Sequence, residues 1–153
     1  MTVRINLWLR NLEIVNRIRW AEVPEGYHCP FCPGHDDEDF YIWDLILNQP
    51  ICDGCTYDLY YALLEVHLEN SVLTDVLPKL EELTGKPAVE SALILVRDEI
   101  AYMEKEENLQ AKIADPREYP TPTRQEIELK WQENLDYFRS LLAKMTKLVE
   151  KKK

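Results

Sequence analysis

Hydrophobic residues recur every three or four positions along much of this chain, which is the spacing of one face of an α-helix. The first such stretch runs from Val3 to Arg19 and predicts an N-terminal amphipathic helix. Arg10 and Arg17 fall on the polar face of this expected helix. Its apolar face would consist of Ile5, Trp8, Leu9, Leu12, Val15 and Ile18.

The central part of the chain has a different pattern. Aromatic and β-branched residues are concentrated between Phe40 and Leu47, a composition that is typical of a β-strand. Residues 48–50 read as a turn, and helical spacing resumes from Tyr57 to Leu68. The order therefore predicts a strand followed by a helix.

Helical periodicity dominates the remainder of the chain. A short helix is expected to end at Gly85, which can adopt the left-handed conformation, and Pro87 suits the first turn of the next helix. Thr123 and Glu126 have the spacing of a capping box and predict the start of a long final helix. The two long apolar stripes contain Val89, Leu93, Val96, Ile100 and Met103, and then Ile127, Trp131, Leu135, Phe138, Leu142, Met145 and Val149. We expect these two helices, joined by the proline-rich segment 115–122, to pair as an antiparallel hairpin.

The four cysteines carry the clearest chemical signal in the sequence. They form two Cys-x-x-Cys pairs, Cys29 with Cys32 and Cys52 with Cys55, separated by nineteen residues. Two such pairs can surround one tetrahedral Zn(II) ion with four thiolates and leave no coordination position open. The sequence therefore predicts one structural zinc ion per chain, with the second pair at the N-terminus of the helix that follows it.

Other ligands and chemistries are weaker readings of the same residues. Iron in the same thiolate cage is one alternative, and a redox dithiol is another, although a thioredoxin-type site uses only one pair on a βαβ framework. His28 and His35 flank the first pair, but four thiolates already complete a tetrahedron. His67 has no ligand partner at helical spacing, so a packed or surface histidine is expected there. No serine lies in a Gly-x-Ser-x-Gly turn, and the sequence predicts no enzyme.

The charge is strongly acidic but unevenly distributed. The whole chain carries a formal charge of −10, whereas residues 1–20 carry +3 and residues 144–153 carry +4, so the middle carries −17. Nucleic acids and anionic membranes usually bind basic faces, so this balance argues against both and favours protein partners with basic surfaces. The acidic run Asp36–Asp39 is read as a solvated loop or as a contact for such a partner. Without a signal peptide or membrane span, we expect a cytoplasmic protein.

Residues 27–70 resemble a known zinc-binding module. A first pair with Phe31 inside it, a strand ending in Leu45-Ile46-Leu47, then Pro50-Ile51-Cys52-Asp53 and a following helix describe a treble-clef zinc finger. This stretch is similar to the N-terminal zinc-binding domain of the ClpX unfoldases. In that family the module dimerises and receives adaptors and substrates, so the resemblance implies a protein-docking platform. Glycine occurs only at positions 26, 34, 54 and 85, which excludes a phosphate-binding loop and hence the unfoldase activity.

Taken together, these patterns predict a mainly α protein with a small α+β treble-clef zinc finger. We expect three units: an N-terminal helix and linker at 1–26, the zinc module at 27–70, and a helical region at 71–153. The leading functional hypothesis is a non-enzymatic protein-interaction protein with an acidic, aromatic surface, and a homodimer through the zinc module or the hairpin is also expected. The alternatives are an acidic inhibitor or immunity-type protein for a basic toxin or nuclease, and a nucleic-acid-binding treble clef.

Overall fold

The protein consists mainly of α-helices and carries one small antiparallel sheet, which confirms the expected fold class. The computed structural model describes residues 17–32, 39–68, 74–114 and 123–151. The sheet has the strand order β1-β2-β3, and its register places Ile18 opposite Trp43 and Phe40 opposite Cys52. The elements are β1 (Ile18–Ala21), β2 (Phe40–Trp43), β3 (Ile51–Cys52), α2 (Asp53–Leu64), η1 (Thr74–Val76), α3 (Leu77–Thr84), α4 (Ala88–Met103), α5 (Glu106–Ile113) and α6 (Arg124–Lys151).

Two strand boundaries differ from the sequence-based expectation. The prediction of an N-terminal helix is wrong at its C-terminal end, because Ile18 and Arg19 belong to β1. Residues 3–16 of that predicted helix lie outside the described residues. Pairing with β2 satisfies the β1 backbone, and such tertiary pairing overrides a local helical period. The second strand is shorter than predicted: the backbone N–H of Leu47 donates to the carbonyl of Trp43 over 2.7 Å, and the resulting turn buries Leu47.

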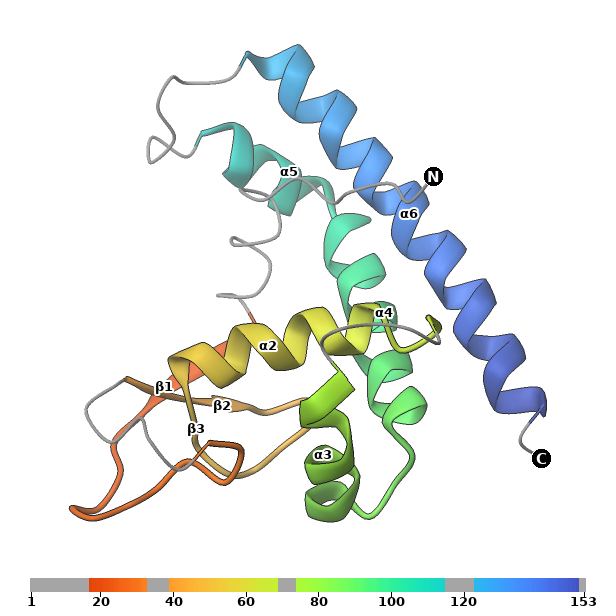
Figure 1. Cartoon of the computed structure of the whole chain (residues 1–153). Helices are drawn as coiled ribbons and strands as arrows, with labels where there is room; N and C mark the ends of the chain where they lie inside the picture. The colour runs from red at the N-terminus through yellow and green to blue at the C-terminus, as the bar shows by residue number, and fades with distance from the viewer. Residues whose placement is uncertain (1–16, 33–38, 69–73, 115–122, 152–153) are drawn as a thin grey trace.

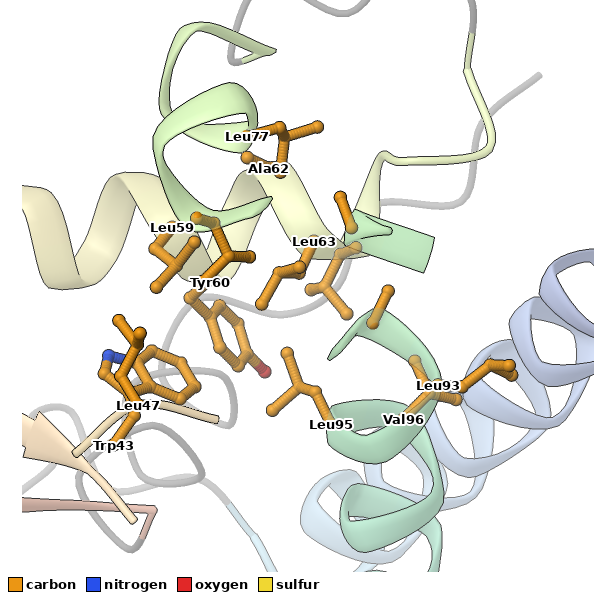
Figure 2. Packing of buried hydrophobic residues seen from close by; sticks show 14 of the residues in the cluster. Trp43, Leu47, Leu59, Tyr60, Ala62, Leu63, Leu77, Leu93, Leu95 and Val96 are labelled. Atoms are coloured by element: carbon orange, nitrogen blue, oxygen red, sulfur yellow. The ribbon is translucent and has the colours of Figure 1, made fainter. Parts of the chain in front are cut away.

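Helix α2 lies along the strands of the sheet and joins the sheet to the helical part of the chain (Figure 1). On its sheet-facing side the ring of Tyr60 lies 6.1 Å from that of Trp43, and both side chains are completely buried. Figure 2 shows the tyrosine ring between Trp43 of β2 and Leu95 of α4. The same core therefore serves both the sheet and the helices.

The turn between α3 and α4 is built as the sequence predicts. Gly85 has φ 71° and its N–H donates to the carbonyl of Glu81 over 2.9 Å, which ends α3 in the left-handed conformation. Pro87 immediately precedes α4, and the N–H of Ala88 donates to the Glu81 carboxylate over 2.9 Å. These contacts hold α3 against the start of α4.

Helices α4 and α6 form the predicted antiparallel hairpin (Figure 1). Near one end of the pair, the indole N–H of Trp131 donates to the carbonyl of Met103 over 2.9 Å. The capping box is present, since the Glu126 N–H donates to the Thr123 hydroxyl over 3.1 Å and the Thr123 N–H to the Glu126 carboxylate over 3.4 Å. Helix α5 comes between them in the chain and contacts both, and the sequence reading did not separate it as an element. None of the helices in the described ranges is long and apolar enough to cross a bilayer.

Arg17, placed on a polar face by the sequence pattern, is instead buried. Its guanidinium pairs with Asp98, lies 3.6 Å from the Glu99 carboxylate and sits 4.3 Å from the centroid of the Tyr102 ring. The side chain of Arg17 is only 6% exposed. These contacts tie the chain just before β1 to α4.

Most of the buried hydrophobic residues belong to one cluster that extends from Cys29 beside the sheet to Met145 on α6. The division into three units, with boundaries at residues 26 and 70, stays a prediction. Contacts cross both of these boundaries. Strand β1 from the first unit pairs with β2 from the second, and α2 packs on α4 from the third. The metal-ligand candidates are thus positioned by a sheet that is anchored on the helical core.

Candidate metal centre

The four cysteines come from three pieces of backbone around the sheet. Cys29 and Cys32 lie in the connection between β1 and β2, whereas Cys52 ends β3 and Cys55 lies in the first turn of α2. Cys52 has an extended backbone, with φ −69° and ψ 161°, and is the N-cap residue of α2. The strand-to-helix change at this point turns both thiols of the second pair toward the first pair, as the sequence predicted.

The four sulfur atoms form a compact group. All four Sγ atoms lie within 4.8 Å of one another, and those of Cys32 and Cys52 are 3.3 Å apart. Zn–S bonds of about 2.3 Å in a tetrahedron place the sulfurs about 3.8 Å apart, so the spacing fits a tetrahedral thiolate site. The cysteines are not joined as disulfides. This is the one group of three or more cysteine, histidine and carboxylate side chains within metal-binding distance that the described ranges contain.

Contacts around the group hold the two pairs together. The ring of Tyr27 packs edge-on against Phe40 with centroids 5.5 Å apart, and its hydroxyl donates to the carbonyl of Pro50 over 2.8 Å. The backbone N–H of Cys52 donates to the Cys29 sulfur over 3.4 Å. The loop bearing the first pair is therefore fixed on the strand that delivers the second.

Burial is the largest influence on the pKa values of Cys29, Cys52 and Cys55. Burial raises the pKa of the Cys29 thiol, but N–H groups of the backbone at Cys52, Phe31 and Cys32 outweigh it, and the net pKa is lowered. Burial together with the neighbouring thiols raises the pKa of Cys52 to about 12 and also raises the pKa of Cys55. Four thiolates at this spacing would repel one another. A divalent metal ion among them would offset this repulsion and favour the deprotonated form of its ligands.

The burial of the cysteines and their number decide whether a bound metal ion could take part in a reaction. Cys29, Cys52 and Cys55 are buried and Cys32 is partly exposed. A metal ion held by all four thiolates has a complete tetrahedral shell, so no position remains for a reacting water or substrate. The donor set fits a structural ion.

The histidines and acidic residues considered from sequence are not part of the sulfur group. His28 is exposed, and His67 lies half-buried beyond the end of α2, where burial and then Lys144 lower its pKa. His35 and residues 36–38 of the acidic run lie outside the described residues, and Asp39 is exposed.

No family model, curated protein or solved structure matches this chain. The site is therefore interpreted from its own geometry and chemistry.

Proposed function

We propose that the four cysteines bind one structural Zn(II) ion and that the surrounding segment is a treble-clef module. The observation that carries this proposal is the group of four Sγ atoms within 4.8 Å of one another, three of them on buried cysteines and none of them in a disulfide. The order of elements supports the treble clef: a loop with the first pair, the β2–β3 hairpin, and a helix whose first turn carries the second pair. Four thiolates prefer zinc to the hard cations, whose ligands are oxygens.

We further propose that the protein is a non-enzymatic interaction protein that presents its zinc module to protein partners. A closed metal site stabilises a surface and supplies no reactive position, which supports docking over catalysis. The net charge of −10 supports a partner with a basic face. The resemblance of residues 27–70 to the zinc-binding domain of the ClpX unfoldases points to the same kind of role.

Capture of partners by metal-loaded and metal-stripped protein tests this function. We expect specific proteins to bind the zinc-loaded chain and not to bind the metal-stripped chain or Cys55→Ser. The bound proteins should dissociate as the salt concentration is raised. A toxin or nuclease among them would select the inhibitor form of the proposal. Equal capture by the loaded and stripped chains, or retention of DNA or RNA instead of protein, would contradict it.

A further inference from the structure

An exposed tryptophan lies beside tyrosine and carboxylate side chains on the sheet. Trp20 of β1 is 57% exposed and stands directly opposite Tyr41 of β2 in the antiparallel register. Directly opposite side chains lie on the same face of a sheet, about 5 Å apart at Cβ. Asp39 precedes Tyr41 by two residues, so it falls on the same face, and it is exposed. One row of the surface thus contains a carboxylate and two aromatic rings.

Helix α2 supplies a second row next to the first. Asp53, Tyr57 and Tyr61 are spaced four residues apart along α2, which places them on one helix face, and all three are half-buried. The face of β2 that carries Tyr41 also carries Trp43, which packs against Tyr60 of α2, so the helix covers this side of the sheet. In Figure 1, α2 lies along the strands on that side.

The two rows meet at the start of the helix. The N–H of Asp53 donates to the carbonyl of Asp39 over 2.9 Å, which fixes the two acidic residues next to each other. Burial and then the charges of Asp53 and Asp39 raise the pKa of Tyr41. Both carboxylates therefore act on the ring that stands opposite Trp20. We define the aromatic–carboxylate patch as Trp20, Asp39, Tyr41, Asp53, Tyr57 and Tyr61.

We propose that the aromatic–carboxylate patch docks an arginine-bearing segment of a partner protein. A guanidinium can stack on tryptophan and tyrosine faces and also pair with carboxylates, and this patch offers both within two adjacent rows. The identification rests on the proposed interaction function and names the surface and the partner chemistry for it.

The chemistry of the patch selects among occupants. A purely apolar segment would cover the exposed carboxylate of Asp39 without bringing an opposite charge to it, and removing a charge from water in this way is costly. A nucleic acid would bring phosphates against the same carboxylates. A cationic segment avoids both costs, and the acidic net charge of the chain attracts it from a distance.

Fluorescence anisotropy with a labelled synthetic peptide of repeated Arg-Gly-Ser units tests the proposal on the zinc-loaded full chain. Trp20→Ala and Asp39→Asn should each weaken binding about two- to thirtyfold, the range that one cation–π or carboxylate contact contributes. A peptide with lysine in place of arginine should bind more weakly, because ammonium groups cannot stack in the same way.

Matched controls separate the patch from general attraction to an acidic protein. Leu129→Ala removes a side chain that is 62% exposed on α6, and Glu133→Gln removes one exposed charge from the same helix. Neither should change the affinity by more than about twofold. Circular dichroism and zinc content would show that the patch variants remain folded.

Any one of the following results would overturn the inference. The first is no binding of the arginine peptide at low salt, and the second is an equal loss of affinity in patch and control variants. The third is a concentration-dependent dimer that Trp20→Ala abolishes, since the occupant would then be a second copy. If Trp20→Ala with Asp39→Asn still captured every zinc-dependent partner, the interaction function would stand and the patch assignment would fail.

Discussion

Replacing Leu95 with alanine tests whether the sheet and the helices share one core. Leu95 is completely buried on α4, on the side facing Tyr60 of α2 (Figure 2). The change removes three carbon atoms, worth about 2.4 kcal/mol in transfer free energy at about 0.8 kcal/mol each. The cavity that remains adds a further penalty, so the free energy of unfolding should fall by about 3 to 5 kcal/mol.

Urea denaturation followed by circular dichroism and by thiol accessibility would measure this effect. With a slope of about 2 kcal/mol per molar urea, the midpoint should fall by about 2 M with little change in slope. Because one core spans both parts, the helical signal and the exposure of the cysteines should shift together. Leu129→Ala, at an exposed position of α6, should change stability by less than about 0.5 kcal/mol. A loss below about 1 kcal/mol, or a helical transition that moves while the thiol transition does not, would refute the reasoning.

Three further perturbations address single features of the fold. Thr123→Ala removes the hydroxyl that caps α6 and should cost about 1 kcal/mol in thermal unfolding, with Ser140→Ala on the exposed face of the same helix as a control that costs less than half as much. Gly85→Ala should lower the free energy of unfolding by about 1 kcal/mol, because alanine is strained at φ 71°. An added Cβ meets no atom within 4 Å, so backbone strain is the whole cost, and an equally stable variant would contradict the left-handed cap. Asp53→Asn should lower the pKa of Tyr57, which burial and then the charge of Asp53 raise above its ordinary value of 10.0. Because the pKa is raised in the folded state, the stability that Tyr57 contributes is complete below pH 10.0 and is lost as the pH rises through the folded-state pKa. An unchanged Tyr57 titration, measured by NMR, would show that the Asp53 carboxylate does not act on this tyrosine.

The helical part of the fold was predictable because its signals are local. The stop at Gly85, the start at Pro87 and the capping box at Thr123 each depend on residues within one or two turns, and each lies where the sequence placed it. The pairing of α4 with α6 was expected from their two apolar stripes, whereas the connection between them contains the additional helix α5. Such features need no knowledge of distant contacts.

Strand β1 and the burial of Arg17 were not predictable in this way. Ile18 continues a helical period, and only pairing with Trp43, twenty-five residues away, makes this segment a strand. Arg17 resembles a surface residue until Asp98 and Tyr102, some eighty residues later, are brought against it. Local periodicity carries no information on either contact.

The metal-site candidates were the most predictable part of the chain, because spacing within each pair already places both thiols on one side of a turn. The meeting of the two pairs follows from the strand-to-helix order around Cys52. The exposed position of Trp20 had no such signal, since it depends on β1 being a strand at the edge of the described sheet.

The metal content of the protein tests the central claim most directly. Elemental mass spectrometry on protein purified without added metal, with thiol titration before and after chelation, should give one zinc per chain and four thiols that become reactive only after the metal is removed. Cys55→Ser should lower the zinc content, because it removes a buried ligand from the group of four. A chain that contains no metal, or native cysteine pairs that are already oxidised, would contradict the structural zinc site and make dithiol chemistry the better account.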